Sequence, residues 1–315
     1  MSNIALIGAG ALGKRHLQSL YDLHEKYDLY VVEVNKSAIS ALQEEMPDVR
    51  YVESISSLPK DIAAAVIATS SNVRRAVFDE LINSCNVDNI IFEKVLFQRE
   101  EDFYAVKDQL EQKGIHAWVN CARREWQAYK DFREKIKDCK VIECNIVGGA
   151  WGMGCNAIHM LDIIEYLAGC KVDELDISKL EPGIEESKRR GFYEFYGTIT
   201  GSAGKCKRFC ITSIKESALP LQIEFVTENG RYIIQEWAGR MLAFEEESGW
   251  TMNECEFRPT FQSQMTARVV KDILDEGKAS LTDYEDSMDL HLKYIIPLIS
   301  YFNDNGIKGD ICPIT

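Results

Sequence analysis

Glycines with the spacing of a phosphate-binding turn lie near the start of the chain. The segment Gly8-Ala9-Gly10-Ala11-Leu12-Gly13 reads G-x-G-x-x-G, after an apolar run at 4–7 and before helical periodicity at 14–26. In this context the first glycine allows a tight turn, the second lets the backbone approach a pyrophosphate, and the third allows close helix–strand packing. The helix N-terminus then offers N–H groups and a partial positive charge. We expect this turn to bind a dinucleotide.

An acidic residue completes this pattern. Glu33 lies 20 residues after Gly13, within a second β-rich run at 29–34. Its carboxylate can accept hydrogen bonds from the adenosine ribose and would repel a 2′-phosphate, so it favours NAD over NADP. Lys36 instead favours NADP, because a nearby cation can bind the 2′-phosphate.

Three further side chains are able to handle a proton or stabilise an oxyanion. Lys94 follows a run at 89–92, at the carboxyl end of an expected parallel strand, where its ammonium could polarise a carbonyl oxygen. His159 lies on a helix predicted over 157–168, and an imidazole suits the removal of a hydroxyl proton near neutral pH. Asp162 shares a helix face with His159 and could orient the imidazole or bind a substrate hydroxyl. Purely structural roles for these residues stay open.

The elements around these residues predict two domains. Apolar runs at 4–7, 29–34, 63–68, 89–92 and 116–120 alternate with helical patterns, which indicates a parallel sheet with right-handed crossovers. The helical patterns are at 14–26, 37–45, 73–84 and 100–113. We expect a dinucleotide-binding Rossmann domain over 1–121.

The remaining residues, 122–315, predict a second domain for substrate binding and oligomerisation. Consecutive strand-like runs with the hairpin signal Glu228-Asn229-Gly230 indicate an α+β domain with an open, mainly antiparallel sheet. The predicted strands are 141–147, 192–200, 207–214, 221–226 and 231–235, and the predicted helices are 157–168, 263–276 and 284–301. Whether the last helix packs back on the first domain stays open.

Composition excludes several classes of function. The chain has 315 residues and a formal net charge of −14, which argues against binding to nucleic acid or to an anionic membrane. The first residues lack the features of a signal peptide, and no apolar run is long enough to span a bilayer, so we expect a cytoplasmic protein. The ten cysteines contain no C-x-x-C pair, so we expect reduced structural thiols and no metal site.

Four segments, in the right order along the chain, resemble the Gfo/Idh/MocA oxidoreductases. The opening Ile7-Gly8-Ala9-Gly10-Ala11-Leu12-Gly13-Lys14-Arg15-His16 is the first of them. Residues 66–72 are similar to the family's A-T-P loop, with Ser70 where proline is usual. Residues 92–96 are similar to its E-K-P motif, with Val95 in place of proline, and residues 157–162 to its G-x-H-x-x-D helix.

The resemblance implies an NAD(P)-dependent dehydrogenase or reductase that acts on CH–OH groups. It implies hydride transfer between a nicotinamide and a hydroxyl or keto group of a sugar, polyol or nucleotide-sugar derivative. The family's catalytic lysine and histidine correspond to Lys94 and His159, but its aspartate corresponds to Cys155. This departure keeps two alternatives open, a non-catalytic dinucleotide-binding regulatory protein and a lyase or hydrolase that uses NAD transiently.

The resemblance and the spacing together assign the site residues. The predicted catalytic residues are Lys94, His159 and Asp162. The predicted cofactor-binding residues are Gly8, Ala9, Gly10, Ala11, Leu12, Gly13, Glu33, Asn35, Thr69, Ser70, Asn72, Glu93 and Lys94. The predicted substrate-binding residues are Asn120, Arg123, Arg124 and Cys155, although the two arginines could equally form a solvated helix start. The expected partners are a carbohydrate-like small molecule and, through the second sheet, one or three further copies of the chain.

Overall fold

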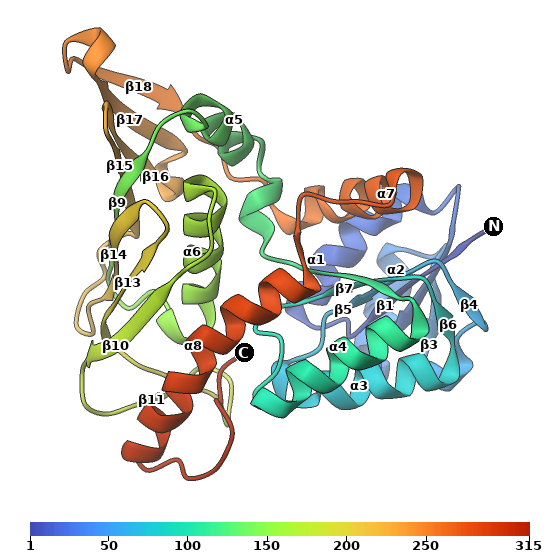
Figure 1. Cartoon of the computed structure of the whole chain (residues 1–315). Coiled ribbons are helices and arrows are strands. Elements are labelled where there is room, and N and C mark those ends of the chain that lie inside the picture. Colours follow the sequence, from blue (N-terminus) through green and yellow to red (C-terminus); the bar gives the residue numbers. More distant parts are fainter. The chain divides into compact units, whose positions relative to one another are not determined.

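A computed structural model describes residues 1–315 and divides into two compact units (Figure 1). Unit 1 consists of Met1–Glu125 and Thr260–Met288, and unit 2 of Trp126–Pro259 and Asp289–Thr315. By its contacts, the segment 260–288 therefore belongs to unit 1. A single domain boundary at residue 121 would instead place this segment in the second domain. The assignment of cofactor binding to residues 1–121 and of substrate binding and oligomerisation to residues 122–315 stays a prediction.

Unit 1 has the expected Rossmann architecture. Its seven-stranded sheet has the order β19-β8-β7-β5-β1-β2-β3 and is parallel except for β19. The strands are β1 (Asn3–Ile7), β2 (Asp28–Val32), β3 (Arg50–Val52), β5 (Ala64–Ile67), β7 (Asn89–Phe92), β8 (His116–Val119) and β19 (Thr282–Asp283). Two short strands, β4 (Asp61–Ile62) and β6 (Asn86–Val87), form a separate pair.

Helices cover both faces of this sheet. They are α1 (Ala11–Leu20), α2 (Lys36–Glu45), α3 (Ser71–Ser84), α4 (Glu100–Lys113) and α7 (Thr266–Glu276). Figure 1 shows α3 and α4 side by side on one face and α1 with α7 on the opposite face. All four residues of β5 are buried, as expected for a strand covered on both sides.

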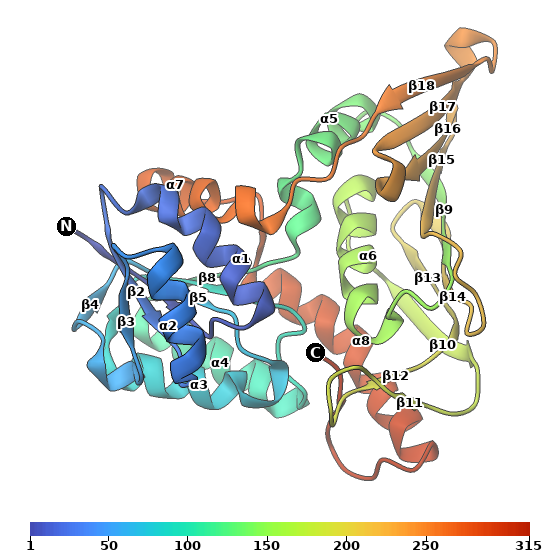
Figure 2. The same cartoon turned by 180° about the vertical axis from the view of Figure 1, so that it is seen from behind.

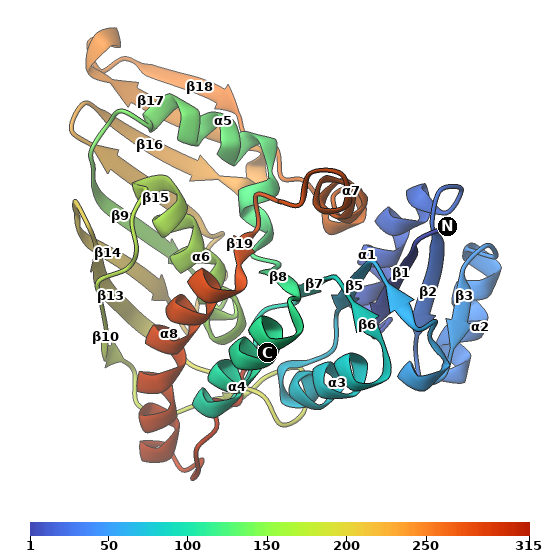
Figure 3. The ribbon, with the colours of Figure 1, turned by 45° about the vertical axis from the view of Figure 1, so that its right-hand side comes forward.

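Unit 2 is built on an eight-stranded sheet of order β10-β13-β14-β9-β15-β16-β17-β18. The strands are β9 (Val141–Gly148), β10 (Glu174–Leu180), β13 (Gly197–Ala203), β14 (Cys206–Ser213), β15 (Gln222–Thr227), β16 (Gly230–Gln235), β17 (Arg240–Glu245) and β18 (Met252–Glu256). Only β9 and β14 run parallel, so the sheet is mainly antiparallel, as predicted. Figures 2 and 3 show α5 (Gln127–Ile136) and α6 (Met153–Ala168) on one face, and no helix of this unit covers the other.

The last helix is α8 (Tyr284–Asp304), whose residues 284–288 belong to unit 1 and whose later residues belong to unit 2.

No helix combines the length and the apolar character that crossing a membrane requires.

Two features of unit 2 differ from the sequence prediction. The single strand predicted over 192–200 is wrong, because β12 (Tyr193–Glu194) pairs with β11 (Glu185–Glu186) and β13 belongs to the large sheet. The break lies just before β13, where Gly197 has a φ of +105° and a Cβ there would lie 2.6 Å from the Lys179 carbonyl oxygen. Helix α5 and the strands β10, β17 and β18 were not predicted, although Tyr129, Phe132 and Ile136 form the buried face of α5.

Candidate functional site

The glycine turn joins β1 to α1 and has little room for side chains. Gly8 has a φ of +90°, a conformation that favours glycine. A Cβ on Gly13 would lie 2.0 Å from the carbonyl oxygen of Gly8, so only glycine permits this close approach of turn and helix. These two residues therefore fix the shape of the turn.

Gly10 differs from its two neighbours in the motif. A Cβ on Gly10 would meet no atom within 4 Å, and its φ is −61°, so the protein's own packing does not require glycine there. Gly10 is the N-cap of α1 and gives the first N–H groups of the helix no side-chain hydrogen bond. Ala11, Leu12 and Gly13 form the first turn of that helix. This open space beside a helix N-terminus fits a dinucleotide diphosphate.

Glu33 ties the end of β2 to the glycine turn. Its Oε2 accepts a hydrogen bond from the Ala9 backbone N–H at 2.8 Å, and its Oε1 accepts one from the Asn35 N–H at 2.9 Å. The Asn35 side chain instead caps α2 by accepting from the N–H groups of Ser37 and Ala38. The structure thus brings Glu33 to the glycine turn, whereas the Asn35 amide oxygen is directed at the start of α2.

The loop after β5 contacts the glycine turn. A Cβ on Gly8 would lie 3.0 Å from Cγ2 of Thr69, which places this residue against the first glycine. Ser70 donates to the side chain of Asn72 at 2.7 Å, at the start of α3. Arg74, on the same helix, is buried and donates to the carbonyl oxygens of Thr69, Val95 and, at 2.8 Å, Leu96. Arg74 therefore links the loops after β5 and β7.

A buried polar network lies at the carboxyl ends of β7 and β8. Glu93 is 2% exposed, and its Oε1 is 2.9 Å from Nε2 of His16 on α1. The amide of Asn120 donates to the same oxygen and also, at 2.9 Å, to Gln262. On its other side the His16 ring contacts the Thr266 hydroxyl at 3.0 Å. The network thereby joins the ends of β7 and β8, helix α1 and the 262–266 segment.

The network sets the charge of Glu93. Burial raises the pKa of this carboxyl, but the hydrogen bond and charge of His16, the charge of Lys94 and the hydrogen bond of Asn120 outweigh it, so the pKa lies below its usual range. Glu93 therefore presents a buried negative charge beside Lys94. The Lys94–Val95 peptide bond is cis.

Arg123 and Arg124 lie just after β8. They form part of a short 3-10 helix, Ala122–Glu125, and both are half-buried. The neighbouring Glu125 is buried and accepts hydrogen bonds from the Ser280 N–H and from Arg268.

In unit 2, the predicted residues lie along helix α6. This helix is almost entirely buried, and its side chains accessible to solvent in the first two turns are Cys155, Asn156 and His159. Cys155, His159 and Asp162 follow at intervals of four and three, so they share one face. Asp162 is only 1% exposed, and the Cys155 thiol donates to the Gly152 carbonyl at 3.5 Å.

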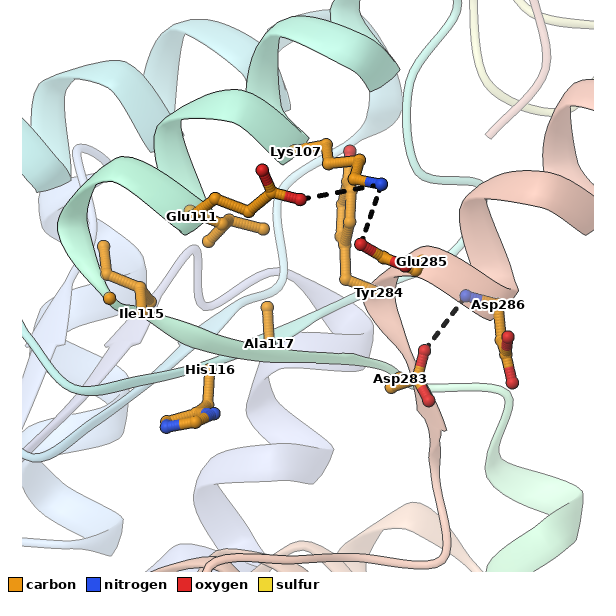
Figure 4. Close-up of a pocket in the computed structure, with 11 residues that line it drawn as sticks. Lys107, Glu111, Ile115, His116, Ala117, Asp283, Tyr284, Glu285 and Asp286 are labelled. Carbon is orange, nitrogen blue, oxygen red and sulfur yellow. Dashed lines mark hydrogen bonds and ion pairs between the residues drawn. The ribbon is translucent and has the colours of Figure 1, made fainter.

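A separate cavity of about 500 Å³ lies at the edge of β8 in unit 1 (Figure 4). None of the predicted site residues line it. Lys107 bridges Glu285 at 2.8 Å and Glu111 at 3.6 Å across its rim, and Asp283 accepts from the Asp286 N–H. The ammonium of Lys107 is therefore already paired with two carboxylates at this rim.

Several residues of these sites were not predicted. His16 belongs to the opening motif, three positions after Gly13, and its place on the buried face of α1 is the signal that could have marked it. Arg74, Gln262 and Thr266 gave no comparable signal, because their partners are distant in sequence.

Comparisons with known proteins agree with this architecture. Residues 2–121 match the Gfo/Idh/MocA family, described as an oxidoreductase family with an NAD-binding Rossmann fold. No curated protein matches the chain in sequence. An oxidoreductase from Agrobacterium radiobacter, solved with NAD+, L-tartaric acid and magnesium, is similar in structure, with a TM-score of 0.76, 14% identity and 98% of each chain covered.

Two further solved structures show the same fold. UDP-N-acetylglucosamine 3-dehydrogenase GnnA from Acidithiobacillus ferrooxidans has a TM-score of 0.73 at 11% identity, covering 92% of this chain and 94% of that one. A super-repressor mutant of Gal80p from Saccharomyces cerevisiae has a TM-score of 0.73 at 13% identity, covering 96% and 95%. The first 121 residues thus carry the match to the Gfo/Idh/MocA oxidoreductase family, and the fold of these solved structures is shared over almost the whole chain.

Proposed function

We propose that the chain is an NAD-dependent oxidoreductase that transfers hydride between nicotinamide and a hydroxyl or keto carbon of a sugar, polyol or nucleotide-sugar derivative. The observation that carries this proposal is the open space at Gly10 beside the N-terminus of α1, with Glu33 tied to the same turn. L-tartaric acid and a UDP-sugar, the compounds of two structural neighbours, support a hydroxylated substrate.

Two side chains of the protein act on the reacting oxygen of the substrate and on its proton. Bound NAD supplies the hydride acceptor. His159, one of three accessible side chains in the first two turns of α6, takes the hydroxyl proton, and Lys94 stabilises negative charge on the substrate oxygen. The buried Asp162 fits a supporting role on the same helix face better than a direct contact with substrate.

The charges near Glu33 favour NAD over NADP. A 2′-phosphate would have to compete with carboxylates for the basic residues of this edge. Lys36 pairs with Glu53 at 3.3 Å, Lys14 with Glu45, and Arg50 with Asp28 at 2.8 Å. These pairs and the carboxylate of Glu33 together disfavour a further phosphate.

Cofactor binding and turnover test the proposal. Isothermal titration with NAD+ and NADP+ should give heat for NAD+ and a weaker signal for NADP+. Absorbance at the wavelength of reduced nicotinamide should then rise with at least one compound of a sugar, polyol and nucleotide-sugar panel. Absence of heat with both dinucleotides would contradict the whole proposal.

The thiol of Cys155 favours a second candidate, a regulatory protein that binds a dinucleotide without turnover. Gal80p, which shares the fold, is described as carrying a super-repressor mutation, and this supports a regulatory role for the architecture. Binding of NAD+ without turnover of any compound in the panel would favour this candidate. Tightly retained cofactor with conversion of a substrate but no net absorbance change would instead favour a lyase or hydrolase.

We also propose that a second copy of the chain covers the open face of the large sheet, giving a dimer or tetramer. Val147, on the central strand β9, points to that face and is 39% exposed. Light scattering after size exclusion should give a mass of at least twice that of one chain. Val147→Arg should shift the mass to one chain, and a wild type that is already monomeric contradicts the proposal.

A further inference from the structure

The accessible end of α6 has no acidic residue of its own. Its accessible side chains there are a thiol, an amide and an imidazole, from Cys155, Asn156 and His159. The acid on the same face, Asp162, is buried. A carboxylate increases the affinity of a site for a polyhydroxy compound, because a hydroxyl group forms a stronger hydrogen bond with an ionised acceptor than with a neutral one.

Strand β12 brings a carboxylate to this end of the helix. Oε2 of Glu194 accepts a hydrogen bond from the Gly154 N–H at 2.8 Å. A Cβ on Gly152 would lie 3.5 Å from the other oxygen, Oε1, and 3.6 Å from Sγ of Cys155. The second oxygen and the thiol therefore lie against the same residue, although Cys155 and Glu194 are far apart in sequence.

Glycines make this approach possible. Gly152, the N-cap of α6, has a φ of +76° and offers no side chain to cap the helix. A Cβ on Gly154 would lie 3.0 Å from Oε2 of Glu194 and 3.0 Å from the Tyr193 carbonyl oxygen, so a larger residue would push β12 away. Pairing of Glu194 with Glu185 and the hydrogen bond from the Tyr193 N–H to the Pro313 carbonyl hold the strand in place.

The direction of helical side chains brings His159 to the same end. Side chains of an α-helix lean toward its N-terminus, so the surface that His159 covers lies over the turn of Cys155. Glu194 is only partly exposed and contacts that turn. The imidazole and the carboxylate therefore flank one accessible patch.

We propose that Glu194 is the substrate-binding carboxylate of this patch, where it accepts a hydrogen bond from a hydroxyl group of a polyhydroxylated substrate beside His159. This inference rests on the proposed function. In that reaction Glu194 holds a neighbouring hydroxyl and changes no bond, His159 takes the proton of the reacting hydroxyl, and bound NAD+ would accept the hydride.

A first experiment tests the juxtaposition without any turnover. Iodoacetamide alkylation of the full chain without added cofactor or substrate, quantified by mass spectrometry of the peptide that contains Cys155, reports the charge beside this thiol. A nearby carboxylate disfavours the thiolate, so Glu194→Gln should alkylate about 3-fold faster or more. Glu186→Gln is the matched control, because Glu186 also accepts a backbone hydrogen bond in the same strand pair. It should leave the rate unchanged.

A second experiment tests the contact with substrate. Glutamine keeps an acceptor for the Gly154 N–H, so Glu194→Gln should fold, with a thermal midpoint close to that of the wild type. Its kcat/KM should fall about 10- to 100-fold, the effect of one charge-assisted hydrogen bond. Glu194→Asp, which keeps the charge but shortens the side chain, provides a further variant, with a smaller fall expected. Adding Cys155→Asp to Glu194→Gln returns a carboxylate to the patch and should recover much of the loss, whereas Cys155→Ala should not.

The outcomes separate this inference from the proposed function. A wild type that turns over no compound contradicts the proposed function, and the substrate role of Glu194 falls with it. An active wild type whose Glu194→Gln variant has the kinetics of Glu186→Gln overturns this inference alone. An unchanged alkylation rate, or a loss of activity that Cys155→Asp does not relieve, also overturns it and leaves Glu194 as a helix cap.

Discussion

The two units hold their candidate residues in different ways. In unit 1 polar groups are fixed by one another or by backbone atoms. His16, Glu93, Asn120 and Thr266 are at most 4% exposed and form one network, and Arg74 binds three carbonyl oxygens. In unit 2 the candidate site is one face of a mostly apolar helix whose first two turns have three accessible side chains.

This difference follows from what each unit is proposed to recognise. The diphosphate is the same in every dinucleotide cofactor. Backbone N–H groups at a helix N-terminus can bind it without a particular set of neighbouring side chains. A rigid polar scaffold keeps such a site in place. Recognition of a particular hydroxylated substrate depends instead on a few side chains, and exchange of one of them changes specificity without repacking the domain. Changes at the glycine turn should therefore affect cofactor binding, and changes on α6 should affect the chemical step.

The largest effect is expected at His159. If the imidazole takes the substrate proton, His159→Ala should lower kcat by about 10²- to 10⁴-fold. Calorimetric binding of NAD+ should stay unchanged, because the glycine turn is untouched. Glu186→Gln, in the same unit but away from α6, is the control and should retain the activity of the wild type. Turnover of a panel substrate by His159→Ala at the wild-type rate would remove the imidazole from the mechanism.

Loss of cofactor affinity without loss of stability is expected at Gly10. A Cβ there meets no protein atom within 4 Å, so Gly10→Ala should unfold at the same temperature as the wild type or slightly higher. The added methyl group would occupy the space assigned to the diphosphate and should weaken NAD+ binding about 10-fold or more. The matched variant Gly13→Ala should instead destabilise the protein, because its Cβ would lie 2.0 Å from the Gly8 carbonyl oxygen. Unchanged NAD+ affinity in Gly10→Ala would place the phosphates elsewhere.

The same contrast explains what could be predicted from the sequence. The glycine turn and Glu33 were recognisable because a strand, a turn and a helix that follow one another in the chain produce the local geometry. The α6 face was recognisable from the spacing of His159 and Asp162. Glu194 was not, because its position depends on β12 leaving the large sheet at Gly197, which periodicity does not reveal.

A smaller change, in cofactor preference, is expected at Glu33. Glu33→Gln keeps an acceptor for the Ala9 N–H but removes the charge that disfavours a 2′-phosphate. The ratio of NAD+ to NADP+ affinity should fall about 3- to 10-fold, a change worth roughly 1 kcal/mol. Adding Glu53→Gln, which releases Lys36, should lower the ratio again. Equal ratios in all three proteins would show that neither carboxylate sets the preference.

The smallest effect concerns the stability of unit 1 in acid. The pKa of Glu93 is lowered in the folded protein, so its ionised form adds stability above the ordinary pKa of glutamate, about 4.3. That stability is lost as the pH falls through the lower, folded value. Urea unfolding at several pH values from neutral to below 4 should therefore show a steeper decline for the wild type than for Glu93→Gln. Glu101→Gln, which removes an exposed carboxylate, should decline as the wild type does. If Glu93→Gln instead runs parallel to the wild type, the His16–Glu93 contact does not hold this charge, and the contrast between a fixed polar scaffold and a sparse substrate face weakens.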